Sequence, residues 1–111
     1  MALARGGRLD KGIIRLGNLT IDTEGQQVQV AGRLVHFPAL QYRLLLYLVQ
    51  NAGRVIPQKR LLEQVWGESS EGSLPKVRVQ ICKLRAALHD SDPWKVQTLS
   101  KRGYSVMQSP Q

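Results

Sequence analysis

The hydrophobic positions of this 111-residue chain change their spacing twice along its length. Between residues 13 and 37, short runs rich in β-branched residues alternate apolar with polar positions, as in Val28-Gln29-Val30. Turn-forming pairs such as Gly17-Asn18 and Ala31-Gly32 separate these runs. Alternation bounded by turn residues is typical of strands that bury one face. The segment therefore predicts an antiparallel meander of three or four strands.

Helical spacing replaces this alternation after Pro38. Proline loses no hydrogen bond in the first turn of a helix, so Pro38 marks a helix start, and Asn51-Ala52-Gly53 marks its end. The apolar positions of this first helix are Leu40, Leu44, Leu45, Leu48 and Val49. A second, short helix is expected from Pro57 to Trp66, with Gly67 as its terminator. Its inner side is made of Leu61, Leu62 and Val65.

A third helix is predicted from Ser73 to about His89. The Ser73 hydroxyl can cap the first turn, and Asp90-Ser91-Asp92-Pro93 breaks the helical pattern. At about 100° per residue, five apolar side chains fall within a stripe of about 80°, which predicts the side that faces the core. They are Leu74, Val77, Ile81, Leu84 and Leu88.

The opposite side of this third helix is cationic, and no acidic residue lies between Ser73 and His89. Val79 and Lys83 lie at its middle. They are flanked by Lys76, Cys82, Ala86 and Ala87, with Arg78, Gln80 and Arg85 on the shoulders. Uncompensated cations favour an external anion, and a helix fits the DNA major groove, where lysine donates to guanine and valine contacts a thymine methyl. The alternative is that Val79 packs on a neighbouring element and the cations are merely solvated.

Two short strands around a basic turn are expected near the C-terminus, from Val96 to Leu99 and from Tyr104 to Met107. The turn consists of Ser100, Lys101, Arg102 and Gly103. Its two cations could lie along a phosphate backbone or reach a minor groove, although charged turns also serve solubility. Together the elements predict an α+β fold of the winged-helix (winged helix-turn-helix) type. It consists of an N-terminal antiparallel sheet, three helices and a C-terminal β-hairpin wing.

Composition narrows the classes of function. The chain has 16 Lys and Arg residues against 8 Asp and Glu residues, and the formal net charge of +8 favours an anionic partner such as nucleic acid or a membrane surface. Cys82 is the only cysteine, which excludes an intrachain disulfide and a cysteine-based zinc site. Neither histidine belongs to a ligand motif. We interpret His36 as a strand residue and His89 as a helix C-terminal residue. Since phosphate-binding glycine loops and nucleophile elbows are also lacking, we expect no enzyme, metal site, cofactor or small-molecule substrate.

The chain is interpreted as one domain. Residues 13–107 form it, residues 1–12 are a flexible basic tail or linker, and residues 108–111 are a C-terminal tail. The longest apolar run, residues 44–49, is too short to span a bilayer, and the N-terminus lacks the apolar core of a signal peptide. The expected location is cytoplasmic, which includes the cytoplasmic domain of a membrane-anchored regulator.

Three stretches of the chain form a recognisable set, HFPALQYRLLLYLVQNAGRVIPQKRLLEQVWG, VRVQICKLRAAL and VQTLSKRGYSV. In their order and separations they resemble the OmpR/PhoB-type winged-helix DNA-binding domain of bacterial transcription regulators. The resemblance implies a response-regulator effector domain, as in two-component systems, that binds direct-repeat or similar DNA sites, often as a tandem dimer. The ending HDSDPWKVQTLSKRGYSV is more similar to the ToxR/CadC-like branch, in which a transmembrane segment follows the domain.

The outer helix face and the resemblance together give the candidate site residues. On the recognition helix, residues 73–89, they are Lys76, Arg78, Val79, Gln80, Lys83 and Arg85. For the wing and the phosphate backbone they are Trp66, Ser100, Lys101, Arg102 and Tyr104. Loop 67–73 matches the segment that in many relatives contacts RNA polymerase, with Glu68, Ser69, Ser70 and Glu71 as candidates.

The chain also departs from the family pattern. Pro75 stands where many relatives have arginine, Arg78 where they often have aspartate, and Ser100 and Ser105 replace frequent wing arginines. The DNA target therefore cannot be carried over. These departures motivate an alternative, a protein-interaction module on a winged-helix scaffold that no longer binds DNA. Trp66, at the end of an amphipathic helix, can equally be a residue at the edge of the core.

Overall fold

The computed structural model describes residues 12–67 and 74–108. Predictions for residues 1–11, 68–73 and 109–111, and for the side chain of Leu74, lie outside this part of the chain. They include the basic tail, the Ser73 cap, and the polymerase-contact candidates Glu68, Ser69, Ser70 and Glu71.

The N-terminal meander has four strands, where the alternating pattern predicts three or four. In order across the sheet they are β1 (Ile13–Leu16), β2 (Leu19–Asp22), β3 (Gln27–Val30) and β4 (Arg33–Val35), each antiparallel to its neighbour. Alternate side chains of the middle strands are buried: Leu19, Ile21, Val28 and Val30. The interpretation of His36 as a strand residue is wrong, because β4 ends at Val35 and the chain leads into Pro38, which has no N–H for a ladder.

The first two helical segments follow the sequence closely. α1 (Ala39–Gln50) begins directly after Pro38, whose carbonyl accepts the Tyr42 N–H at 2.9 Å. The second predicted helix comprises α2 (Gln58–Leu61) and η2 (Leu62–Trp66), the latter wound as a π-helix. Gly67 ends it in the left-handed region, with φ of 71°. The expected inner side is buried, as Leu61, Leu62 and Val65 show.

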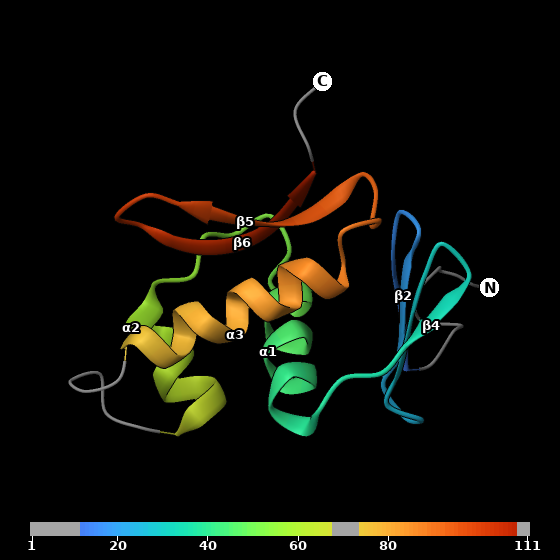
Figure 1. Ribbon diagram of the computed structural model, residues 1–111, viewed down its shortest axis with the longest axis horizontal. Coiled ribbons are helices and arrows are strands. Elements are labelled where there is room, and N and C mark those ends of the chain that lie inside the picture. Colours follow the sequence, from blue (N-terminus) through green and yellow to red (C-terminus); the bar gives the residue numbers. More distant parts are fainter. Residues whose placement is uncertain (1–11, 68–73, 109–111) are drawn as a thin grey trace.

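The third helix and the hairpin complete the winged helix (Figure 1). α3 (Leu74–Ala87) is slightly shorter than predicted, since residues 88–90 form a turn. β5 (Trp94–Leu99) and β6 (Gly103–Gln108) pair antiparallel, and each is longer than its predicted strand. We call β5, β6 and the turn between them the wing. Gln108, assigned to the C-terminal tail, is the last residue of β6.

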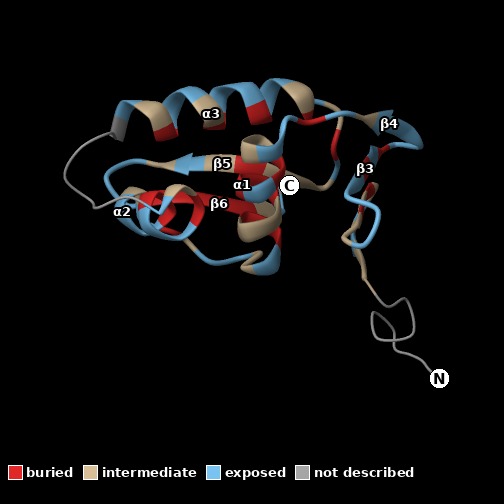
Figure 2. Ribbon diagram, turned by 90° about the horizontal axis from the view of Figure 1, so that it is seen from below, coloured by how far each residue is buried: buried red, intermediate tan, exposed pale blue. Residues whose placement is uncertain are grey.

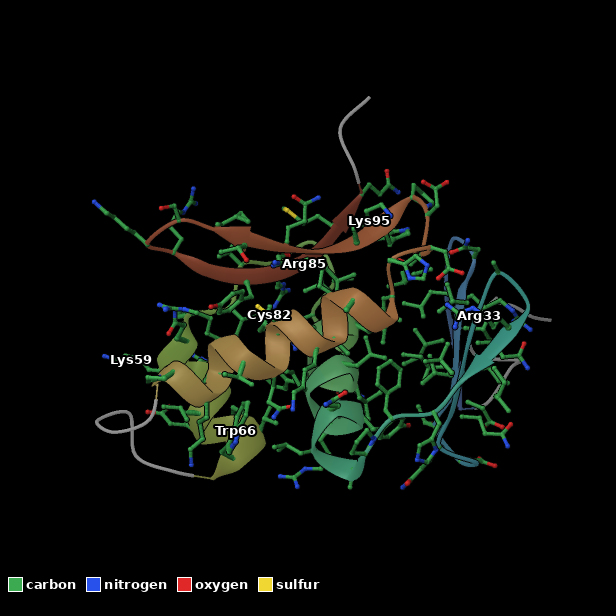
Figure 3. The ribbon with its side chains drawn as sticks, in the orientation of Figure 1. Arg33, Lys59, Trp66, Cys82, Arg85 and Lys95 are labelled. Atoms are coloured by element: carbon green, nitrogen blue, oxygen red, sulfur yellow. The ribbon has the colours of Figure 1, made fainter. Side chains whose placement is uncertain are left out.

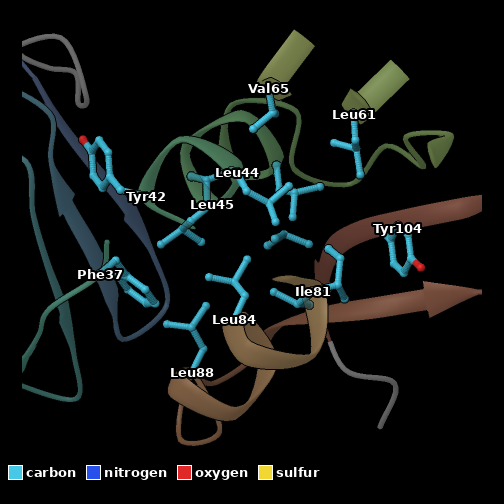
Figure 4. Close-up of a cluster of buried hydrophobic side chains, with 14 of the residues drawn as sticks. Phe37, Tyr42, Leu44, Leu45, Leu61, Val65, Ile81, Leu84, Leu88 and Tyr104 are labelled. Atoms are coloured by element: carbon cyan, nitrogen blue, oxygen red, sulfur yellow. The ribbon is translucent and has the colours of Figure 1, made fainter. Parts of the chain in front are cut away.

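A shared core joins the helices. Figure 4 shows Leu44 and Leu45 of α1, Val65 of η2, and Leu84 of α3 pointing into one cluster. The core side of α3 is confirmed where it is described: Val77, Ile81, Leu84 and Leu88 are all buried. Figure 2 shows the same division, with buried segments of α3 toward the wing and α1 and exposed segments on its outer side. None of the helices within residues 12–67 and 74–108 has the length and hydrophobicity that spanning a bilayer requires.

The N-terminal sheet is attached to the turn that follows α3. The Asn18 N–H donates to the Asp92 carbonyl at 3.0 Å, and the Asp92 N–H donates to Asn18 Oδ1 at 2.8 Å. Arg33 of β4 pairs with Asp90 at 2.6 Å. At Gly17 a Cβ atom would lie only 2.5 Å from Pro93 Cδ, so the two segments approach closely. The position of the sheet is therefore tied to the C-terminal end of α3.

Candidate nucleic-acid interface

The outer face of α3 is open, as its periodicity predicts. Val79 is 50% exposed, and Arg78, Cys82, Lys83 and Ala86 are exposed around it. The alternative in which Val79 packs on a neighbouring element is not observed. Because α3 is anchored by fully buried leucine, valine and isoleucine side chains on its other side, this face is presented on a fixed support.

Two candidate residues on α3 are less accessible. Lys76 and Gln80 are partly buried. The side-chain oxygen of Gln80 is buried and has no hydrogen-bond partner among the described residues. An unpaired buried amide oxygen is unfavourable, so Gln80 gains a partner if its side chain turns outward. A base contact by Gln80 would require this rotation.

Arg85 is turned toward the wing (Figure 3). Its Nε donates to the Val96 carbonyl at 3.3 Å, and its Nη2 donates to Thr98 Oγ1 at 2.5 Å. The sequence pattern predicted Arg85 on a shoulder of the recognition helix but did not reveal these bonds, because helical spacing does not say which shoulder faces β5.

The basic turn of the wing is exposed. Ser100, Lys101 and Arg102 are exposed, and the Arg102 N–H donates to the Leu99 carbonyl at 2.8 Å. Lys101 adopts a positive φ of 65°. The predicted tip is therefore present, with both of its cations in solvent.

The wing and the start of α2 are joined by the backbone. Ile56 and Tyr104 exchange two hydrogen bonds, of 2.8 and 3.0 Å. Gly103 allows this contact, because a Cβ atom there would lie 2.6 Å from the carbonyl carbon of Ile56. Tyr104 itself is only 3% exposed. Its hydroxyl accepts a long hydrogen bond from Gln58 Nε2 at 3.4 Å.

This junction creates a basic hollow that sequence reasoning missed. A cavity of ≈ 310 Å³ lies between α2 and the wing turn, and three of its lining residues are the cations Lys59, Lys101 and Arg102. Gln58 and Tyr104 also line it. The only local sign of this hollow in the sequence is the basic pair Lys59-Arg60 after Pro57. Nothing in the sequence indicated that this pair lies near a turn some forty positions later.

The candidate Trp66 and the family departure Ser105 occupy partly or fully internal positions. Trp66 is partly buried and packs against the hydrophobic core, which agrees with the core-edge alternative. Ser105, taken as a replacement for a wing arginine, is fully buried in β6. Its position is therefore internal and not on the wing surface, and its hydroxyl has no partner among the described residues.

Asp90 and Asp92 follow the C-terminal end of α3. The hydrogen bond from Arg33 is the main cause that lowers the pKa of Asp90 below its usual value. Asp90 is thus a carboxylate at neutral pH and neutralises Arg33 instead of a cation on the outer face of α3. Within the described residues no cluster of three or more His, Cys, Asp and Glu side chains could hold a metal ion.

Comparisons with known proteins identify related domains. Residues 32–106 match the family model described as "Transcriptional regulatory protein, C terminal". The chain is 30% identical over 94 residues to the sensory transduction protein RegX3 of Mycolicibacterium smegmatis, and the match covers 85% of this chain and 41% of RegX3. The chain thus spans less than half the length of that relative.

Solved structures agree in fold. The Klebsiella pneumoniae RstA DNA-binding domain, solved in complex with the RstA box, superposes with a TM-score of 0.78 at 30% identity, covering 86% of this chain and 96% of RstA's. The DNA-binding domain of Escherichia coli CadC gives a TM-score of 0.74 at 28% identity, covering 90% and 94%. The similarity therefore extends over most of the described fold, including the wing.

Proposed function

This chain belongs to the OmpR/PhoB-type family of DNA-binding domains of transcriptional regulatory proteins, and we propose that it places α3 in the DNA major groove and its wing on the adjacent backbone or minor groove. The observation that carries this proposal is the open, acid-free outer face of α3, with Val79 50% exposed among cations. The RstA domain, similar in fold and solved on its DNA, supports it.

The side chains divide into two roles. Lys83 and Val79, at the middle of the outer face, would read base edges, since lysine donates to guanine acceptors and valine contacts a thymine methyl. Lys101, Arg102 and Lys59 line one hollow and would contact phosphates. The first pair would give sequence specificity, and the second group would give affinity for any duplex.

Two partners extend the proposal. A homodimer on DNA follows from the direct-repeat sites that the family resemblance implies. Contact with RNA polymerase would use loop 67–73. Its acidic side chains Glu68 and Glu71 would be repelled by DNA phosphates. Beyond Gly67 this loop lies outside the described residues. Both partners, and action in the cytoplasm, are proposals that rest on the family.

Selection of bound sequences from a random duplex library tests the proposal directly. We expect one enriched motif, repeated at a fixed spacing if the domain dimerises on DNA. Affinity for the selected duplex should fall by about 0.9 log units per log unit of salt for each phosphate neutralised. Failure to enrich any sequence, with no retention of duplex at low salt, would favour the protein-interaction alternative.

A further inference from the structure

The wing has two different attachments to the rest of the domain. β6 is joined to Ile56 by the two backbone hydrogen bonds of the Ile56–Tyr104 bridge. β5 is joined to α3 through the Arg85 side chain, which reaches the Val96 carbonyl and Thr98 Oγ1. The first attachment fixes the wing relative to α2, and the second fixes it relative to α3.

The second attachment occupies an open sheet edge. β5 and β6 form a two-stranded sheet, so among the described residues β5 has a strand partner on one side only. Backbone carbonyls at such an edge need donors from elsewhere. The guanidinium of Arg85 supplies one donor to the backbone and a second to a side chain two residues further along the strand. Its planar fork allows both bonds at once, which a lysine ammonium on its flexible stem does not reproduce.

We propose that Arg85 is a positioning residue for DNA binding, which holds the wing at a set distance from α3. This inference rests on the proposed function. From Thr98 the wing extends about three residues to its turn, or ~10 Å, so a rotation of about 10° at the base moves the turn by ~2 Å. A shift of that size breaks a hydrogen bond to phosphate. Without the Arg85 bonds to β5, Lys101 and Arg102 therefore no longer contact the DNA backbone while α3 lies in the major groove.

A direct phosphate contact by Arg85 is the competing role. The two roles differ in what they require of Thr98, because only the positioning role needs its hydroxyl as an acceptor. Thr98→Val removes that acceptor while keeping the branched shape and every charge. Thr98→Ser is the matched control, since it keeps the hydroxyl.

The first test is a double-mutant cycle on affinity for the selected duplex. We expect Thr98→Val and Arg85→Lys each to weaken binding about fivefold, which is about 1 kcal/mol and matches the net value of one ordinary hydrogen bond, and the double variant to be no weaker than the worse single variant. Thr98→Ser should bind like the parent protein. Parent-like affinity of Thr98→Val, or losses that multiply in the double variant, would overturn the proposal.

The second test uses the free domain, so it separates this inference from the proposed function. Amide spectra and hydrogen exchange of residues 99–103, recorded without DNA, should change in both Thr98→Val and Arg85→Lys. Arg78→Lys is the control on the same helix, because among the described residues no hydrogen bond joins Arg78 to the wing, and it should leave these amides unchanged. If the wing amides stay at their parent positions in both variants, Arg85 does not position the wing. Failure of the parent domain to bind any duplex would refute the proposed function and leave this second test valid.

Discussion

Substitution of Gly103 by alanine tests the junction that carries the wing. An alanine Cβ would lie 2.6 Å from the carbonyl carbon of Ile56 and 2.9 Å from Pro57 Cα. Both are backbone atoms, which cannot move aside as a flexible side chain can. The φ of 138° at this position is also one that L-residues rarely adopt. The wing must therefore move away from residues 56 and 57.

The expected cost has two parts. Backbone strain at such a φ contributes about 1–3 kcal/mol. Loss of the two Ile56–Tyr104 hydrogen bonds adds about 0.5–1.5 kcal/mol each. The sum of about 2–6 kcal/mol is a large share of the ~5–15 kcal/mol that stabilises a small domain. Gly103→Ala should also separate Lys59 from Arg102 and so weaken DNA binding.

Gly32→Ala provides the matched control. Gly32 has a φ of 79°, but no atom lies within 4 Å of where its Cβ would be. It should therefore show only the strain component, about 1–3 kcal/mol. Urea unfolding of the two variants and the parent gives the comparison. Equal losses of unfolding free energy in both variants would show that the close approach at Ile56 does not contribute, and would refute the reasoning.

Three further predictions address the interface and the joint to the sheet. Lys83→Ala should cost about 1–3 kcal/mol at one base pair of the selected site, whereas Lys101→Ala should weaken all duplexes alike; identical behaviour across a panel of sites would contradict the two roles. Lys59→Ala should lower the slope of log affinity against log salt by about 0.9, and an unchanged slope would remove Lys59 from the phosphate contacts. The Arg33–Asp90 pair should stabilise the fold fully above pH 3.8, the usual pKa of the carboxyl, and progressively less as the pH falls through the lowered pKa of the folded state. In urea unfolding, the parent protein should therefore have a higher free energy of unfolding than Asp90→Asn from neutral pH to about pH 5, and the difference should shrink below about pH 4. A difference that stays constant down to pH 2 would contradict this role of the pair.

The core side of α3 shows how far periodicity reaches. The spacing of Val77, Ile81 and Leu84 predicted their burial correctly, and the same spacing placed Val79 outward. Both are local consequences of helix geometry and need no knowledge of neighbours. Tyr104 and Ser105 show the limit, because burial of β6 depends on what packs on each of its faces.

Residues close together in the chain were enough to predict most strands and helices and the buried face of α3, and three stretches at the family's separations were enough to indicate the family. Two features came from the packing of the elements alone, since Lys59 and Arg102 line one hollow and Arg85 reaches β5. The first depends on the Ile56–Tyr104 bridge, which joins positions far apart in the chain, and the second on which shoulder of α3 lies against the wing. Helical spacing orders side chains around an axis, but the packing of the elements decides what each side chain meets.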